Sequence, residues 1–465
     1  MRDKPFVHLF KVHSKEYLYD VNMDTILRIP VEVFEYYSEG KNSKIAQNYI
    51  AHYKQLGYLK SNRVEKTEHP DTKYIQYYHK NFLNTLILQV TQNCNLTCDY
   101  CIYSGSYQMR KYSEKRMTWD MAKNGVDYLI QHSIDAISLT IGFYGGEPLL
   151  EFNLIKMIVA YIRERIEGKK VFFNITTNAT LLTDEIMEFF VKNKFTVLIS
   201  FDGPKEYHDS ARKFAESQKG SYDIVIKKLS IFKAKYPDYY KKHIMFNTVL
   251  DPSKPYSWIE KYIKKNSLFK NNFFLSTYIT NVYAVEKRAI SKENIEDMQY
   301  EKFITLMYML GRVSKENKGK LLQEDNAINE IFDSQGSVIK IPQIGHRNGP
   351  CTPGYHKLFM NVDGDFFPCE RVSECSKATK IGNIFSGLDT RRCEEMLNLQ
   401  KLTEEECRNC WAYLHCSTCI VYADDLNKLS RVNILKQCKN VTNSLETVMK
   451  DYVVLKELGY SYSKE

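Results

Sequence analysis

The sequence predicts an α/β protein of three parts: a small amino-terminal module, a central region of parallel strands and helices, and a cysteine-rich carboxyl-terminal region. Strand and helix patterns alternate from Leu86 to Leu250, three short strands precede them, and nine of the twelve cysteines follow residue 350. A chain of 465 residues also exceeds one typical hydrophobic core. We therefore expect several domains around a parallel α/β centre.

The composition argues against a nucleic-acid or membrane partner. Lys and Arg exceed Asp and Glu by 65 to 56, and the resulting charge of +9 is spread along the chain without a basic block. The amino terminus lacks the apolar core of a signal peptide, and no apolar run is long enough to cross a bilayer. We expect a cytoplasmic protein, in which cysteines are more often metal ligands than disulfides.

The first part reads as a small winged-helix-like module. Strand patterns cover residues 6–12, 16–21 and 25–29, and Pro30 stands where a helix can begin. A second helix is expected after Ser43 and before Gly57. Its predicted packed face consists of Ile45, Tyr49, Ile50, Tyr53 and Leu56. The polar stretch from Ser61 to Lys73 is interpreted as a linker.

The central part alternates strands with helices. The expected strands are 86–90, 137–143, 171–176, 196–201 and 245–250, and the expected helices are 118–132, 153–167, 183–193 and 221–235. Such alternation predicts parallel strands joined by crossover helices. Ligands of these folds gather at the carboxyl ends of the strands.

Three cysteines follow the first of these strands. Cys94, Cys98 and Cys101 come within eight residues, directly after the apolar stretch Leu86–Val90. Thiolates are the usual ligands of a [4Fe-4S] cluster, and three of them leave one of its four irons open for a small molecule. Zinc is the alternative, although zinc prefers four ligands in paired C-x2-C units.

This C-x3-C-x2-C motif, with Tyr100 just before its last cysteine, resembles the radical S-adenosylmethionine (radical SAM) enzymes. The resemblance implies a partial (β/α)6 TIM-like barrel. It also implies that Cys94, Cys98 and Cys101 are catalytic cluster ligands, with S-adenosyl-L-methionine bound at the open iron and cleaved to a 5'-deoxyadenosyl radical.

Further strand ends carry motifs similar to those of the same family. Gly145, Gly146 and Glu147, followed by Pro148, match the motif that holds the amino group of the cofactor. By the same resemblance, the candidates for contacts with its ribose and carboxylate are Asn178, Ser200 and Arg212, and Tyr100 is also expected at the cofactor. We interpret Asp202 as a structural or substrate-facing residue.

The late cysteines resemble the SPASM extension of radical SAM enzymes, although the last interval of the motif is one residue short. The resemblance implies two auxiliary [4Fe-4S] clusters and thus three clusters in all. One would use Cys407, Cys410, Cys416 and Cys438. The other would use Cys351, Cys369 and Cys419, with Cys375 as an uncertain fourth ligand and Cys393 as a free thiol. Zinc in the two C-x2-C pairs is again the alternative.

The leading module is similar in pattern to precursor-recognition domains, in which a leader peptide adds a strand to a sheet edge. A packing appendage is the alternative. We predict recognition in residues 1–75, the barrel in 80–300, a helical bridge in 301–344, the SPASM domain in 345–445 and a tail in 446–465.

These resemblances together indicate a maturase that forms thioethers in a ribosomally made, cysteine-rich precursor peptide, of the sactipeptide or ranthipeptide type. Its expected reductant is a flavodoxin or ferredoxin. The alternatives are a carbon–carbon crosslink, an epimerisation, formylglycine formation in a sulfatase, or a non-catalytic iron–sulfur electron carrier. A carrier has no use for a nucleoside pocket, and sulfatase maturation needs no leader-binding module.

Overall fold

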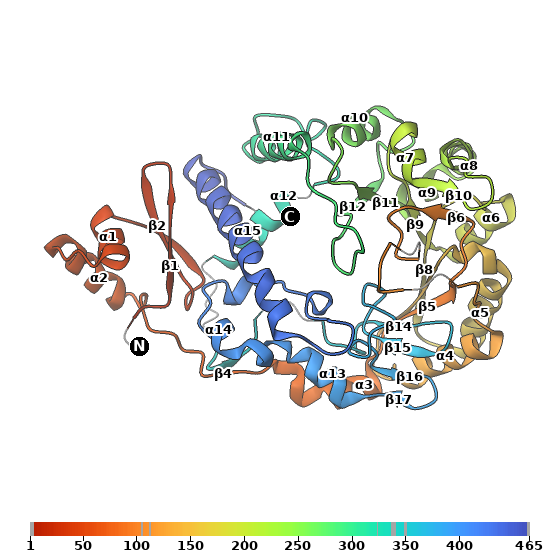
Figure 1. Ribbon diagram of the computed structural model, residues 1–465, viewed down its shortest axis with the longest axis horizontal. Coiled ribbons are helices and arrows are strands. Elements are labelled where there is room, and N and C mark those ends of the chain that lie inside the picture. Colours follow the sequence, from red (N-terminus) through yellow and green to blue (C-terminus); the bar gives the residue numbers. More distant parts are fainter. Residues whose placement is uncertain are drawn as a thin grey trace.

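The computed structural model of the chain describes residues 4–103, 106–110, 113–322, 324–335, 341–347 and 351–462. A small amino-terminal domain and the central barrel lie at opposite ends of the molecule, and the carboxyl-terminal region lies between them (Figure 1). Among the described residues, no helix is long and apolar enough to cross a membrane.

The amino-terminal domain is a three-stranded antiparallel sheet with two helices. Its elements are β1 (Val7–Val12), β2 (Lys15–Asp20), β3 (Thr25–Ile29), α1 (Val31–Glu39) and α2 (Lys44–Gln55), in the sheet order β1-β2-β3. The three strands and both helices confirm the predicted elements. Pro30 occupies the N-cap position of α1, and the Ser43 side chain caps α2 by accepting from the amide of Ala46.

The predicted packed face of α2 is correct for Ile50 and Tyr53 and wrong for the other three residues. Ala46 and Ile50 are the buried residues of this helix, whereas Ile45, Tyr49 and Leu56 are 50%, 43% and 56% exposed. The helix has apolar residues on two faces, and the packed one is set by contact with the sheet. An exposed apolar stripe therefore remains on the outer face of α2.

The segment predicted as a linker is packed against the carboxyl-terminal region. It contains β4 (Lys66–Thr67) and most of the 3-10 helix η1 (Pro70–Tyr74), and α3 (Ile75–Asn81) follows it. β4 pairs with β13 (Ile344–Gly345). Thr67 is fully buried, and both its amide and its hydroxyl donate to the carboxylate of Glu404.

The central part is a partial barrel of six parallel strands. In sheet order these are β5 (Thr85–Thr91), β7 (Ser138–Gly145), β8 (Lys170–Thr177), β9 (Thr196–Ser200), β11 (Ile244–Leu250) and β12 (Phe273–Tyr278). The α/β fold and the strand-and-helix alternation are thus confirmed. The sixth strand, β12, supplies the barrel strand that the sequence pattern left unplaced.

Helices cover the outer surface of the barrel. They are α4 (Trp119–Gln131), α5 (Phe152–Arg165), α6 (Asp184–Asn193), α7 (Lys205–Ala211), α8 (Tyr222–Lys235), α9 (Pro237–His243) and α10 (Ser257–Lys265), with a 3-10 turn η2 (Pro148–Glu151). Threonines at 118 and 183 cap α4 and α6 through their side chains. The largest core of the molecule lies between these helices and the strands.

The carboxyl-terminal region extends the barrel sheet. β14 (Leu358–Met360) pairs in parallel with β5, and β15 (Asp365–Phe367), β16 (Gly382–Asn383) and β17 (Gly387–Leu388) continue the sheet in antiparallel fashion. Cys369 follows β15 by two residues. The late cysteines are therefore carried by a sheet that is continuous with the strand leading to Cys94.

Helices complete the connection between the three parts. They are α11 (Lys292–Met309), α12 (Glu324–Ser334), α13 (Thr390–Leu397), η3 (Leu399–Thr403), α14 (Glu404–Arg408), η4 (Tyr413–His415), η5 (Ile420–Tyr422) and α15 (Arg431–Glu457). α15 packs against α12 and β1, and it lies beside the amino-terminal sheet in Figure 1. The predicted boundary at residues 445 and 446 falls inside α15.

Candidate active site

The three early cysteines lie in a loop that a short two-stranded sheet holds in place. β6 (Leu96–Cys98) pairs antiparallel with β10 (Arg212–Phe214), with Cys98 opposite Arg212. Backbone amides approach two of the sulfurs: Leu96 N is 3.4 Å from Cys94 Sγ, and Tyr103 N is 3.5 Å from Cys101 Sγ. Amide donors of this kind suit sulfurs that carry negative charge on an iron–sulfur cluster.

The environment of these thiols combines burial with nearby positive charge. Burial raises the pKa of all three, to about 12 for Cys94, and Arg212 opposes the rise at each thiol. At Cys101 the charge of Arg110 acts in the same direction as that of Arg212. One buried and two partly buried thiols beside two guanidinium groups fit an anionic iron–sulfur group, since the cations offset the cost of burying negative charge.

The glycines at 145 and 146 are required by a close approach to the cysteine loop. A Cβ on Gly145 would lie 2.0 Å from the carbonyl oxygen of Thr91, and a Cβ on Gly146 would lie 2.1 Å from that of Asn93. Gly145 also has a φ of +141°. The turn after β7 is thereby fastened to the backbone that leads into Cys94, with amides of residues 146 and 147 donating to those two carbonyls.

Glu147 joins the ends of β7 and β8. Its carboxylate accepts from the Thr177 hydroxyl at 2.7 Å, from the Asn178 amide at 2.8 Å and from the Leu149 amide at 3.0 Å. Burial raises the pKa of Glu147 to about 7, against the pull of these donors. The carboxylate is thus fixed beside the cysteine loop; its contact with the cofactor amine remains a prediction.

Asn178 reaches from the end of β8 to the cysteine loop. Its side-chain nitrogen lies 3.9 Å from Cys94 Sγ and donates to Asn95 Oδ1 at 2.9 Å. Its oxygen accepts from Thr180. Ser200 ends β9, in register with Asn247 of β11. The polar strand ends therefore converge on the mouth of the barrel, as parallel strands require.

Asp202 organises the other side of the site. The Arg212 Nε atom donates to Asp202 Oδ2 at 2.7 Å, the Tyr100 hydroxyl donates to the same oxygen, and the guanidinium lies 5.4 Å from the Tyr100 ring centroid. Asp202 is fully buried. Two predicted cofactor residues, Tyr100 and Arg212, thus both bond to the carboxylate of Asp202. The sequence predicted only a structural or substrate-facing role for Asp202.

A neutral histidine supports this ion pair. Burial lowers the pKa of His208 to about 3. The amide of Asp202 donates to His208 Nδ1 at 3.3 Å, while His208 Nε2 lies 3.0 Å from Ser221 Oγ. The sequence prediction did not include this role of His208. The available signal is the order Asp202, His208 and Arg212 within eleven residues.

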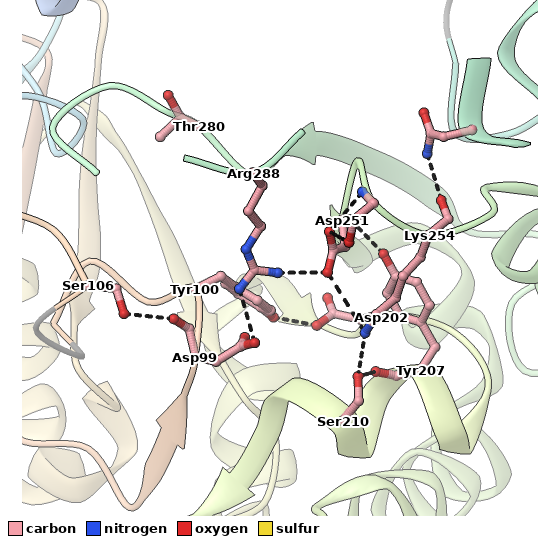
Figure 2. Close-up of polar contacts among 12 residues, drawn as sticks. Asp99, Tyr100, Ser106, Asp202, Tyr207, Ser210, Asp251, Lys254, Thr280 and Arg288 are labelled. Carbon is pink, nitrogen blue, oxygen red and sulfur yellow. Dashed lines mark hydrogen bonds and ion pairs between the residues drawn. The ribbon is translucent and has the colours of Figure 1, made fainter. Parts of the chain in front are cut away.

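A loop after β12 crosses the barrel mouth and is held there by Arg288. Figure 2 shows Arg288 between Asp99 of the cysteine loop and Asp251 at the end of β11, at 3.0 and 2.6 Å respectively, near Tyr100 and Asp202. Earlier in the same loop, the Tyr283 hydroxyl donates to Asp424 at 2.6 Å. The loop therefore touches both the cysteine loop and the carboxyl-terminal region.

Four of the late cysteines cluster. Burial raises the pKa of Cys407, of Cys410 (to about 11) and of Cys438, and neighbouring thiols of the same set, Cys416 among them, add to each rise. The guanidinium of Arg347 lies 3.7 Å from Cys416 Sγ, and Thr403 Oγ1 lies 3.1 Å from Cys407 Sγ. The structure thus brings together the four residues expected to hold one auxiliary cluster.

The second auxiliary set is less complete. Burial raises the pKa of Cys369 to about 11, and the neighbouring thiol of Cys419 contributes to the rise. Cys351 and Cys375 are exposed, whereas Cys393 is fully buried in the main core. All twelve cysteines are described, and none is in a disulfide. The ligation by Cys351, Cys369 and Cys419 therefore stays a prediction.

The described residues contain no group of three or more His, Cys, Asp or Glu side chains arranged to hold a single metal ion.

The six-stranded partial barrel, with three cysteines after its first strand and a cysteine-rich carboxyl-terminal region, has the architecture of a radical SAM protein. Residues 88–265 match the Radical SAM superfamily. The matched residues span most of the partial barrel, from within β5 to the end of α10.

Curated relatives match parts of the chain. The chain is 39% identical over 140 residues to the uncharacterized protein MJ0907 of Methanocaldococcus jannaschii, covering 30% of this chain and 46% of the relative. It is 30% identical over 227 residues to the radical SAM cyclopropyl synthase TigE of Paramaledivibacter caminithermalis, covering 47% and 43%. The chain spans less than half the length of these relatives.

A solved structure shares the fold over a larger part of the chain. The structure described as native anSMEcpe with bound AdoMet and Cp18Cys peptide is 22% identical, with a TM-score of 0.57, and the match covers 81% of this chain and 99% of that one. At this identity the likeness shows a common fold. It extends beyond the radical SAM domain into the carboxyl-terminal region.

Proposed function

We propose that the protein is a radical SAM enzyme that modifies a ribosomally synthesised, cysteine-rich precursor peptide, most simply by forming thioether crosslinks. The convergence of Cys94, Cys98 and Cys101 with Glu147, Asn178 and Arg212 at one barrel mouth carries this proposal. Bound there, a [4Fe-4S] cluster with S-adenosyl-L-methionine would supply a radical able to remove hydrogen from a peptide carbon.

The chain's own residues would bind and orient the cofactor. The buried Arg212 and Asp202 hold Tyr100 beside the cysteine loop, and Glu147 and Asn178 hold the opposite rim. These groups exclude water and present fixed donors and acceptors of the kind that a ribose and an amino acid moiety require. A non-catalytic electron carrier would have no need of them.

The late cysteines support a reaction that needs further electron transfer. The four-cysteine set and the Cys369 and Cys419 pair lie in a region continuous with the barrel sheet. Auxiliary clusters held there would take up the electron that remains when a peptide thiol and a carbon are joined. A flavodoxin or ferredoxin is the proposed source of the electron that starts the reaction.

The amino-terminal sheet is the proposed leader site, with β3 as the receiving edge. The other edge strand, β1, packs against α15, and the amide of the adjoining Phe6 donates to the carbonyl of Lys60. At the β3 edge, Gln335, at the end of α12, accepts from the Ile26 amide at 2.7 Å and donates to the Asp24 carbonyl at 3.0 Å. The Tyr53 hydroxyl also lies 3.4 Å from the Arg28 carbonyl of this strand. A peptide strand that pairs along all of β3 would replace these contacts.

Formylglycine formation in a sulfatase is the second candidate. Its support is the anSMEcpe fold across nearly that whole chain, together with 32% identity over 161 residues to the cysteine-type anaerobic sulfatase-maturating enzyme of Clostridium novyi, covering 33% of this chain and 42% of the relative. The amino-terminal sheet favours the peptide maturase, because sulfatase maturation requires no leader-binding domain.

Two measurements test the proposal. Anaerobic reconstitution should give about twelve irons per chain and release 5'-deoxyadenosine when a reductant is added. Co-expression with a short cysteine-rich peptide encoded beside the gene should give a product lighter by two hydrogens for each crosslink. Zinc in place of iron, or no cleavage of the cofactor, would refute the proposal, and an unchanged peptide mass would refute the crosslink.

A further inference from the structure

A buried ion pair outside the predicted cofactor contacts lies between the two groups of cysteines. Arg110 Nε is 2.5 Å from Glu374 Oε1, and the two side chains are 1% and 7% exposed. Such a pair is costly to bury, and replacement by apolar residues is often neutral or stabilising. Its position therefore calls for a role beyond packing.

Arg110 lies against the loop of the early cysteines. Its guanidinium carbon is 5.2 Å from the ring centroid of Tyr103, whose backbone amide lies 3.5 Å from Cys101 Sγ. It is also 5.9 Å from the ring centroid of Tyr144, the residue before the two glycines. The positive charge thus sits in an aromatic, water-poor pocket directly beside the residue that binds the Cys101 sulfur.

Through Glu374, the ion pair is also connected to β5, the strand that leads to Cys94. Its carboxylate accepts from the side-chain nitrogen of Gln89 at 2.7 Å and from that of Gln92 at 3.5 Å. Gln89 is fully buried on β5 and also donates to the Tyr103 hydroxyl at 2.7 Å. These bonds hold the carboxylate beside the guanidinium, and the Gln89 nitrogen links it to the Tyr103 hydroxyl.

The other contacts of the pair are with the late cysteine segment. The Arg110 guanidinium donates to the carbonyl of Glu370, the residue after Cys369. The amides of Glu374 and Cys375 both approach the carbonyl of Met109, at 3.1 and 3.4 Å. The pair therefore joins the backbone next to Cys369 and Cys375 to the loop of the early cysteines.

We infer that Arg110 is a positioning residue that raises the reduction potential of the cluster proposed at Cys94, Cys98 and Cys101, and that Glu374 limits this effect. Reduction adds one negative charge to the cluster, and a nearby cation that cannot lose its proton stabilises the reduced form. The effect is strong because the surroundings are buried and of low dielectric. The inference rests on the proposed function.

The test is a reduction-potential titration of the reconstituted full-length protein, followed by electron paramagnetic resonance. The cluster is identified as the one whose signal changes when S-adenosyl-L-methionine is added. We expect a more negative midpoint potential in Arg110→Gln and a more positive one in Glu374→Gln. Arg110→Lys, which keeps the charge, should stay close to the wild-type protein.

Arg116→Gln is the matched control. Arg116 also lies near the cysteine loop, opposite Thr91 in an isolated bridge, but its side chain is 56% exposed, so solvent screens its charge. In Arg116→Gln, the midpoint potential of the cofactor-responsive cluster should equal that of the wild-type protein. If the Arg110→Gln variant does not hold a cluster, the expected positive shift of the midpoint potential in Glu374→Gln still tests the inference.

Two outcomes overturn the inference. Equal potentials in all variants would do so, and so would shifts of Arg110→Gln and Glu374→Gln in the same direction, as expected from a mere disturbance of packing. If the wild-type protein cleaves the cofactor while the potentials are equal, only this inference fails. If the wild-type protein forms no cofactor-responsive cluster, the proposed function fails with it.

Discussion

Arg212 donates to Asp202 through Nε at 2.7 Å, and both side chains are almost completely buried. The pair links two elements of the site, because Arg212 lies opposite Cys98 in the β6–β10 sheet and Asp202 follows β9. The Val249 amide of β11 donates to the same carboxylate at 3.0 Å. One carboxylate thus connects the cysteine loop to two barrel strands.

Replacing Asp202 by Ala should destabilise the protein strongly. Removal of one partner leaves the Arg212 charge buried without compensation, a change that costs about 3–5 kcal/mol. We expect a marked fall in the midpoint of thermal unfolding, measured by circular dichroism, and weaker binding of S-adenosyl-L-methionine. Asp223→Ala is the control, because the side chain of Asp223 is 70% exposed and pairs only with Lys205. An equal loss in both variants would contradict the role of burial.

Glu147 should make the stability of the cofactor-free protein depend on pH. Its pKa is raised by burial from 4.5 to about 7, so the folded protein holds this proton more tightly than the unfolded chain does. The stabilising contribution is complete below pH 4.5 and is lost as pH rises to about 7, a change on the order of 3 kcal/mol.

Glu147→Gln should remove this part of the pH dependence. The measurement is the thermal unfolding midpoint of wild-type and variant protein at intervals from pH 5 to pH 7.5. The difference between the two proteins, rather than either curve alone, isolates Glu147 from other titrating groups. Parallel curves would show that the carboxyl does not titrate in this range.

Much of the site was predictable because the carboxyl ends of parallel strands meet at one edge of a sheet. This rule was enough to place Cys94, Glu147 and Asn178 near one another, whereas Arg212 was expected from the family resemblance. It could not show that the side chains of Tyr100 and Arg212 meet on Asp202, because that contact depends on the pairing of β6 with β10. This pairing joins segments more than 110 residues apart.

The incorrect predictions for the packed face of α2 and for the linker also come from long-range contacts. Ile45 and Ile50 both fit a helical apolar pattern, and only contact with the sheet selects Ile50 as the buried one. The region from Ser61 to Lys73 reads as a linker from its polar composition. It is held in place by Glu404, which lies 337 residues away from Thr67 in the chain. Such long-range contacts leave no local signal.

Iron content should separate cluster ligands from the buried thiol of Cys393. Replacing Cys98 by Ala should reduce the iron of the reconstituted protein by about four atoms per chain, and replacing Cys407 should have a similar effect through a different cluster. Cys393→Ala should leave the iron unchanged, because this thiol is packed among apolar side chains of the main core. Loss of iron from the Cys393 variant would contradict the proposed ligand sets.

Removing the side chain of Gln335 should free the edge of β3 at Asp24 and Ile26. The Gln335 side chain is hydrogen-bonded to both the Ile26 amide and the Asp24 carbonyl, the two groups that an added strand would use at that position. Gln335→Ala should speed hydrogen exchange in residues 24–29 by roughly five- to tenfold, since one hydrogen bond contributes about 0.5–1.5 kcal/mol. Exchange would be followed by mass spectrometry.

The same variant tests β3 as the leader site. A precursor peptide that pairs with β3 must displace Gln335 in the wild-type protein, so Gln335→Ala should bind that peptide more tightly, and the bound peptide should protect residues 24–29 in both proteins. Gln47→Ala is the control, because Gln47 is exposed on α2 and bonds only to Asn42. Protection that appeared on β1 and left β3 unchanged would assign the leader to the opposite edge of the sheet.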